Sequence, residues 1–230
     1  MVGTTNEAVR KEWLSNTLKK LPDGLRLLDA GAGELANKKF CGHLDYISQD
    51  FCQYEGTGDN RGLQTGSWDT KKIDIIGDIT NIPEEDESFD VILCTEVLEH
   101  LPDPVEALIE FQRLLKKSGT LILTAPFCSL THFAPYHYST GFNRYFYEYH
   151  LEGLGFKLGN IKTNGNFFEY LGQEIHRIPS MADKFTSQKA SRIERIAMKI
   201  VLTMLERFSK NDTTSDEVLC FGYQMIAIKS

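Results

Sequence analysis

The sequence predicts an α/β protein with a Rossmann-like, doubly wound sheet that is mostly parallel and ends in an antiparallel last strand. Apolar segments of strand length alternate with segments of helical periodicity along most of the chain. The apolar run at Leu27–Leu28 passes directly into a glycine turn that ends at Gly33. Three successive strands end in an acidic residue, as expected where a parallel sheet gathers a ligand at its carboxyl edge.

The first half of the chain supplies most of the expected sheet. A helix is expected over 8–21, where apolar residues recur at helical spacing until Pro22-Asp23-Gly24 ends it. Pro104 is expected to open a second long helix, at the first helical position that proline favours. A short helix is expected over 35–41. Strands are expected at 25–29, 44–49, 73–76, 89–95 and 120–125.

A glycine-rich stretch, 53–70, stands where a helix would ordinarily follow the second strand. It holds four glycines, little apolar content and a lone Trp68. Structureless loops of this length usually cover a site or move, so we expect this loop to lie over a cofactor.

The second half is less regular. Residues 127–150 are rich in aromatic side chains and include three histidines. Beyond them we expect a helical turn at 148–153, a strand at 156–161, an amphipathic helix at 193–208, a polar loop at 211–217 and a closing strand at 219–228. With no repeat or linker in view, residues 1–230 are expected to form a single domain with substrate-side insertions around 127–150 and 163–215.

Composition restricts the classes of function. A formal net charge of −7 disfavours a general nucleic-acid binder, and no apolar run is long enough to span a membrane. The five cysteines contain no C-x-x-C pair, and the first residues have no features of a secretory signal. These observations predict a cytoplasmic protein that binds no nucleic acid and no membrane, and they say nothing about its substrate.

The acid before the glycine turn indicates the kind of ligand. Asp29 would direct a negative charge toward the place where a dinucleotide-binding turn receives a pyrophosphate. An ammonium or sulfonium group fits that charge better than a phosphate does. Asp50 follows Gly33 at about the spacing of an acid that binds ribose hydroxyls. Asp78 could accept from an adenine amino group while Ile79 packs beside the ring.

These motifs together resemble the class I S-adenosylmethionine-dependent methyltransferases, in the broad group of type 11 methyltransferase domains. The resemblance spans 25–127 and includes Leu28-Asp29-Ala30-Gly31-Ala32-Gly33, Gly77-Asp78-Ile79, Thr95-Glu96-Val97-Leu98-Glu99-His100 and Leu114–Pro126. It implies the seven-stranded fold of that family and S-adenosyl-L-methionine as the cofactor. The cofactor-binding residues it implies are Asp29, Gly31, Ala32, Gly33, Asp50, Phe51, Asp78, Ile79, Thr95 and Glu96. The sequence departs from the family pattern after the second strand, where Phe51-Cys52-Gln53-Tyr54 and the glycine-rich loop follow.

The segment after the fifth strand offers the candidates for a general base. His132 and His137 lie where substrate loops occur in such folds, and a histidine can remove a hydroxyl proton near neutral pH. The alternative is that these histidines and their tyrosine neighbours simply cap the sheet edge. Glu96-x-x-Glu99-His100, completed by His132 or His137, could also hold a divalent ion, as similar residues do in ubiquinone-pathway and small-RNA methyltransferases. The same residues cap a turn in relatives without metal, so no metal is predicted.

The predicted function is methyl transfer from S-adenosylmethionine to a small molecule, with a hydroxyl of a sugar or natural-product intermediate as the leading acceptor. Nitrogen and carbon acceptors stay open. One alternative is an NAD(P)-dependent oxidoreductase, favoured by the glycine spacing but opposed by Asp29 and Asp78. Another is a catalytically inactive protein that keeps the cofactor fold. The helix at 193–208 has three interpretations: a cover for the sheet, a lid over the acceptor, or the face of a homodimer.

Overall fold

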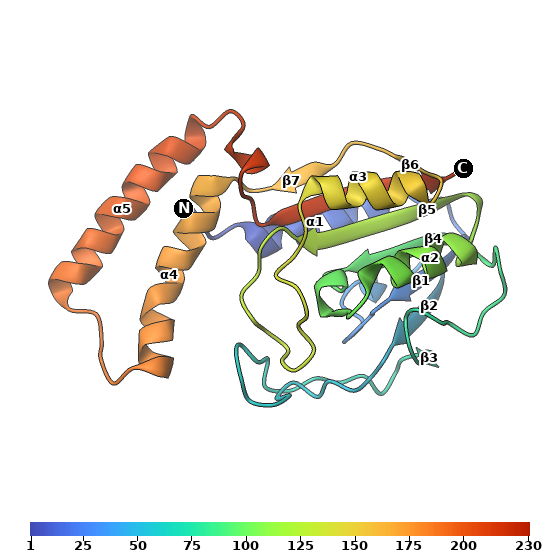
Figure 1. The fold of residues 1–230 in the computed structure, drawn as a ribbon, viewed down its shortest axis with the longest axis horizontal. Coiled ribbons are helices and arrows are strands. Elements are labelled where there is room, and N and C mark those ends of the chain that lie inside the picture. The colour runs from blue at the N-terminus through green and yellow to red at the C-terminus, as the bar shows by residue number, and fades with distance from the viewer. The chain divides into compact units, whose positions relative to one another are not determined.

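The computed structural model describes residues 1–230, which divide into two compact units. One unit comprises 12–162 with 222–230 and contains the sheet. The other comprises 1–11 with 163–221 and is mainly helical. Figure 1 shows the elements of both.

The larger unit is built on one sheet whose strands follow the order β3-β2-β1-β4-β5-β8-β6. β2, β1, β4 and β5 are parallel neighbours, β3 joins at the edge beside β2, and β8 runs antiparallel to β5. The expected fold class, including the antiparallel last strand, is confirmed. The strands are β1 (Arg26–Ala30), β2 (Asp45–Asp50), β3 (Ile75–Ile76), β4 (Phe89–Thr95), β5 (Leu115–Pro126), β6 (Phe156–Leu158) and β8 (Gly222–Lys229).

Helices cover both faces of this sheet (Figure 1). α1 (Asn6–Leu18) places Leu14 and Leu18 in a core cluster with Leu27, Val91 and Ile122. α2 (Pro104–Leu114) and α3 (Arg144–Gly153) lie on the opposite face. α2 begins as the sequence predicts. Asp103 caps it by accepting from two backbone amides of the first turn, and proline takes the first position.

Some expected elements are shorter in the structure. The expected helix at 35–41 is reduced to a 3-10 turn, Lys38–Phe40, and the strand at 73–76 to the two residues of β3. The side chain of Asp74 accepts hydrogen bonds from the amide and hydroxyl of Ser48 on β2. Residue 74 is therefore joined to β2 through its side chain and is not part of strand β3. The strand expected at 156–161 ends at Leu158, and a separate short strand, β7 (Lys162–Asn164), follows.

The smaller unit contains α4 (Phe167–Phe185) and α5 (Arg192–Lys210), followed by a 3-10 turn at Ser215–Glu217. The sequence predicted α5 but not α4, whose pattern is interrupted by Pro179 inside the helix. The two helices meet through Phe168 and Phe208, whose ring centroids are 5.5 Å apart. The first residues of the chain pack here as well, because Val2 is buried and the amide of Gly3 donates to Glu169. None of the helices in the structure has the length and apolar character needed to cross a membrane.

Candidate active site

Asp29 occupies the end of β1 and is completely buried. One carboxylate oxygen, Oδ2, accepts a hydrogen bond of 2.6 Å from the Tyr46 hydroxyl on β2, and the other, Oδ1, is buried without a hydrogen-bond partner. Burial raises the pKa of Asp29 to about 7, the Tyr46 hydrogen bond opposes the shift, and the negative charge of Asp50 adds to it. A cationic hydrogen-bond donor that reached Oδ1 would stabilise the ionised carboxylate, because this buried oxygen has no other partner.

The glycine turn after β1 is held by the end of β2. The amides of Gly31 and Ala32 both donate to the carbonyl of Gln49, and the amide of Gly33 donates to Asp50 Oδ2 at 2.9 Å. Asp50 Oδ1 accepts from the amide of Cys52 at 2.8 Å. Each oxygen of Asp50 therefore keeps one backbone contact, and a carboxylate oxygen can accept a second donor such as a ribose hydroxyl.

The remaining expected cofactor residues lie on the ends of β3 and β4. Asp78 is exposed and accepts from the amide and hydroxyl of Thr80, while Ile79 is buried. Thr95 accepts from Asn37, and Glu96 accepts from the Thr124 hydroxyl at 2.9 Å. Because the backbone of Gly77 donates to the carbonyl of Asp50, the end of β3 is tied to the same sheet edge.

The glycine-rich loop lies against the glycine turn. A Cβ added at Gly33 would come within 2.7 Å of the Trp68 ring, and the backbone there is left-handed with φ of +53°. Trp68, Tyr54 and Phe133 form an aromatic cluster, with ring centroids 4.5 to 5.7 Å apart. The loop therefore reaches the turn through a packed aromatic contact rather than through its backbone alone.

The same loop is hydrogen-bonded to the segment after β5. The amide of Leu63 donates to the carbonyl of Thr131, and the amide of Phe133 donates back to Leu63. Nearer the strands, the rings of Phe51 and Tyr136 meet edge to face at 5.0 Å. The two loops that the sequence assigns to the cofactor and to the acceptor thus form one continuous wall.

Three histidines gather beside this wall. The ring centroids of His100, His132 and His137 lie 4.6 to 5.8 Å from one another, and the buried carboxylate of Glu99 lies 3.6 Å from His100 and 4.0 Å from His132. Both predicted base candidates are therefore in one cluster. His100 is the member that the sequence did not propose as a base.

Burial and the neighbouring imidazoles lower the pKa of two of these rings, which keeps them neutral near pH 7. Burial lowers the pKa of His100 to about 3, helped by the neighbouring imidazoles, and its Nδ1 lies 2.5 Å from the carbonyl of Tyr136. Burial and His132 lower the pKa of His137, whose Nε2 lies 3.1 Å from the Ser129 hydroxyl. Since the Nδ1 of His132 lies 2.8 Å from the Leu130 carbonyl, its Nε2 carries the lone pair.

The alternative of a metal site has a geometric basis in part of its expected ligand set. Donor atoms of Glu99, His100 and His132 lie within 4.8 Å of one another, a set that could hold a divalent ion. Glu96 does not belong to this group, because its carboxylate accepts from Thr124 on β5.

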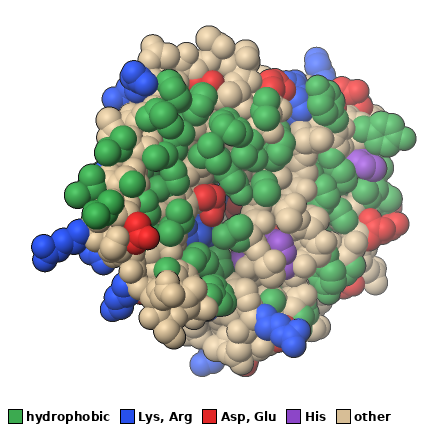
Figure 2. Space-filling model, turned by 60° about the vertical axis from the view of Figure 1, so that its left-hand side comes forward, with side chains coloured by type: hydrophobic (Ala, Val, Ile, Leu, Met, Phe, Trp, Pro, Cys, Tyr) green, Lys and Arg blue, Asp and Glu red, His purple; other side chains and the backbone are tan.

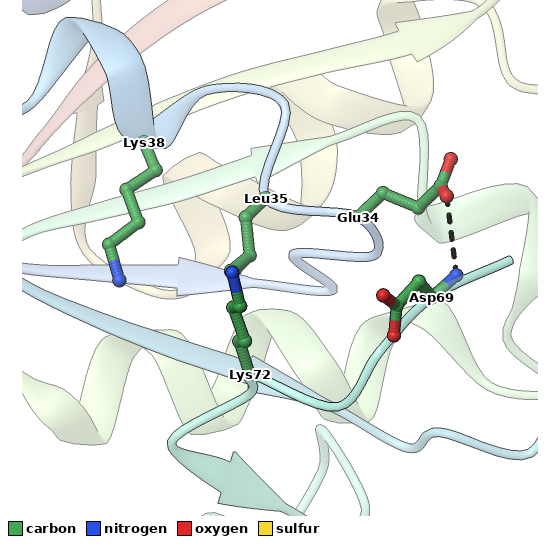
Figure 3. Close-up of a pocket in the computed structure, with 5 residues that line it drawn as sticks. All are labelled: Glu34, Leu35, Lys38, Asp69 and Lys72. Carbon is green, nitrogen blue, oxygen red and sulfur yellow. Dashed lines mark hydrogen bonds between the residues drawn. The ribbon is translucent and has the colours of Figure 1, made fainter.

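A cavity of about 530 Å³ opens where the glycine turn meets the end of the glycine-rich loop. Figure 3 shows its lining residues, with the Glu34 carboxylate bonded to the backbone amide of Asp69. Lys38 and Lys72 supply the opposite charge, and Leu35 is the one apolar side chain among them. Two carboxylates and two ammonium groups give the cavity no net charge with which to select an ion.

The strand order and this edge of the sheet have the fold of the class I methyltransferases, a class whose cofactor is S-adenosylmethionine. More narrowly, residues 28–123 match the family model described as a methyltransferase domain.

Relatives and solved structures agree with this family. The chain is 30% identical over 159 residues to a demethylmenaquinone methyltransferase of Renibacterium salmoninarum, covering 68% of this chain and 61% of that one. A stretch of 40 residues is 48% identical to a ubiquinone biosynthesis O-methyltransferase of Pasteurella multocida, covering 17% of this chain and 16% of that one. The six curated relatives are matched over 15% to 61% of their own length.

Among solved structures, a putative sarcosine dimethylglycine methyltransferase from Galdieria sulphuraria aligns with a TM-score of 0.57 at 17% identity, covering 97% of this chain and 86% of that one. The [4+2]-cyclase SpnF aligns with a TM-score of 0.59 at 17% identity, covering 99% and 83%. At this identity the likeness concerns the fold, and a fold of this kind serves a cyclase as well as methyltransferases.

Some contacts of the site were outside the reach of the sequence. The Tyr46 hydroxyl on Asp29 depends on the register that places Leu27 opposite Tyr46, which no local pattern specifies. The contact of Trp68 with Gly33 joins residues 35 positions apart through a loop without periodicity. The lone tryptophan in a polar, glycine-rich stretch was the one available signal.

Proposed function

We propose that this chain transfers the methyl group of S-adenosylmethionine to a hydroxyl of a small molecule, with sugars and natural-product intermediates as the acceptor class. The observation that carries the proposal is the buried Oδ1 of Asp29, which has no hydrogen-bond partner. The ammonium of a bound methionine moiety would supply both the missing donor and the opposite charge. The relatives from Renibacterium salmoninarum and Pasteurella multocida are both named methyltransferases. The second is named an O-methyltransferase, which supports an oxygen acceptor.

The residues at the carboxyl edge of the sheet divide the cofactor between them. Asp29 would hold the ammonium, Asp50 the ribose hydroxyls, and Asp78 with Ile79 the adenine. The backbone at Thr95 and Glu96 would flank the sulfonium. When bound, the cofactor supplies an electrophilic methyl group, and the wall formed by the two loops excludes water from it.

Removal of the acceptor proton falls to the histidine cluster. His137 is the first candidate, because its lowered pKa keeps the ring neutral and able to accept a proton at neutral pH. His132 is the second, because its Nε2 carries the lone pair beside Glu99. A hydroxyl held within hydrogen-bond reach of either ring would lose its proton as the new bond to carbon forms.

We also propose that residues 1–230 act as a single methyltransferase domain in which 127–150 and 163–215 serve the acceptor side. All five cysteines are unpaired, which supports a cytoplasmic location.

Thermal unfolding with S-adenosylhomocysteine tests the cofactor, and NADH is the control ligand. At about a hundredfold excess over Kd, binding stabilises by about 2.7 kcal/mol, which corresponds to roughly 5–10 °C for a chain of this length. A shift with S-adenosylhomocysteine alone is the expected result. A shift with NADH alone would instead favour the oxidoreductase.

Transfer of a labelled methyl group to pools of hydroxylated acceptors tests the reaction. His137→Ala and His132→Ala are expected to lower kcat by roughly 10²–10⁴-fold if either ring is the base. His43→Ala is the matched control, because His43 precedes β2 and bonds the carbonyl of Leu21 away from the site. Cofactor binding without transfer to any pool would identify an inactive cofactor-binding protein instead.

A further inference from the structure

Exposed apolar side chains are concentrated in the smaller unit. Of the 17 large hydrophobic residues that are exposed, eight lie in α4 and α5, although these helices make up a minor part of the chain. We call these eight the apolar stripe. Its members are Ile178, Phe185, Ile193, Ile196, Ile200, Val201, Met204 and Phe208. Figure 2 brings the α4–α5 side forward and shows hydrophobic side chains gathered there, with Lys and Arg at the margin and some Asp and Glu among them.

Except for Phe208, whose ring contacts Phe168 of α4, the stripe is not the surface by which the two helices pack. On α5 the less exposed large apolar side chains are Met198, Leu202 and Leu205, spaced as one helical face. Ile193, Ile196 and Ile200 lie on a different face and are 79%, 58% and 66% exposed. A helix with a second, exposed apolar face needs a further surface to cover it.

Basic residues border the stripe. The segment 184–199, at the junction of the two helices, has five basic side chains and one acidic one, in a chain whose net charge is −7. Near the end of α5, Arg207 lies on the same helical face as Ile196 and Ile200, and Lys210 pairs with Glu206 at 3.1 Å. The exposed rings of Phe185 and Phe208 each make a cation–π contact with the preceding residue. Lys184 Nζ lies 5.2 Å from the centroid of the Phe185 ring, and Arg207 Cζ lies 5.1 Å from that of Phe208.

We propose that the α4–α5 hairpin docks on an anionic lipid surface, with the apolar stripe entering the headgroup boundary and the basic border facing the lipid phosphates. An amphipathic helix with isoleucine and phenylalanine on one face and lysine and arginine on the other lies in the plane of such an interface. A second copy of this chain paired in parallel fits less well, because it brings the two basic segments 184–199 together. This is a peripheral contact, so the absence of a spanning helix stands. It is independent of the proposed methyl transfer.

Flotation of the full chain with lipid vesicles tests the proposal. The wild-type protein is expected to float with vesicles of phosphatidylcholine and phosphatidylglycerol at low ionic strength, and to dissociate as salt is added. Vesicles of phosphatidylcholine alone are expected to bind much less. No binding to the anionic vesicles would overturn the proposal.

Two variants assign the binding to the stripe and its border. Ile200→Glu is expected to abolish flotation, whereas Ile109→Glu, the same change at an exposed position of α2, is expected to leave it intact. Replacing Lys189 and Lys199 by Gln is expected to weaken partitioning about 25-fold, since each basic residue near an anionic surface contributes about fivefold. Equal flotation of Ile200→Glu would overturn the assignment. A second result would also overturn it: the wild-type protein is a dimer that does not bind vesicles, and Ile200→Glu makes it a monomer. A second copy of the chain would then cover the stripe.

Discussion

Replacing Asp29 by Asn is expected to stabilise the protein at pH 8 while abolishing cofactor binding. The folded pKa of about 7 is roughly three units above the value of an unfolded aspartate, near 3.9. The folded protein therefore holds this proton more tightly than the unfolded chain does. Raising the pH from about 4 to about 7 lowers the free energy of unfolding, by at most about 4 kcal/mol.

An asparagine has no charge to lose, so the variant escapes this cost above pH 7. Its side-chain oxygen can still accept from the Tyr46 hydroxyl, but its amide would take the place of the buried Oδ1, which has no partner. An unsatisfied buried amide costs about 1–2 kcal/mol. The expected net gain at pH 8 is about 2–3 kcal/mol, or roughly 5–10 °C in Tm. At pH 5, where the wild-type carboxyl is protonated, the variant should be no more stable than the wild type.

The assay is unfolding of both proteins between pH 5 and pH 8.5, with and without S-adenosylhomocysteine. Asp74→Asn is the control. Partial burial opposes the shift there, but hydrogen bonds from Ser48 hold the pKa of Asp74 below its usual value, so that substitution should lower stability at pH 8. A raised pKa of Asp29 is contradicted if Asp29→Asn is less stable than the wild type at pH 8, or if wild-type stability does not fall between pH 5 and pH 7.5.

Three further outcomes are expected. Amides of 56–66 should become protected from hydrogen exchange when S-adenosylhomocysteine binds, and unchanged exchange would contradict a covering role for the loop. Gly33→Ala should weaken S-adenosylhomocysteine binding and lower Tm, because the new methyl group meets Trp68 at 2.7 Å on a left-handed backbone. Gly42→Ala, in open space, should stay within about 0.5 kcal/mol of the wild type. Treatment with EDTA should leave methyl transfer unchanged, and loss of activity restored by a divalent ion would assign Glu99, His100 and His132 to a metal instead.

The sequence could predict the central sheet because its strands are buried on both faces and so appear as continuous apolar runs. The expected bounds of β4 agree with the structure residue for residue. The short β3 could not be bounded in the same way, because Ile76 is exposed and the pairing extends over only two residues. Helix α4 was not predicted because it contains Pro179. A proline in a periodic segment ordinarily marks the end of a helix, but here the helix continues past it.

At the site, the acids were predictable from their position and their contacts were not. Asp29 and Asp50 follow apolar strands and precede turns, a local pattern that can be read along the chain. The hydrogen bonds that join Leu63 to Thr131 and Phe133 connect segments about 70 residues apart, and only the folded sheet brings them together. The histidine cluster has the same origin, because His100 follows β4 whereas His132 follows β5.

The contact between Trp68 and Gly33 gives this protein a fluorophore at the glycine turn, the proposed site of the cofactor. The chain has one other tryptophan, Trp13, which packs against the core beneath α1. Emission from Trp13 should therefore be constant while emission from Trp68 changes with whatever enters beside the turn. A Trp13→Phe variant would leave a single emitter, with which cofactor affinity and the opening rate of the glycine-rich loop could be measured by titration and stopped flow without any added label.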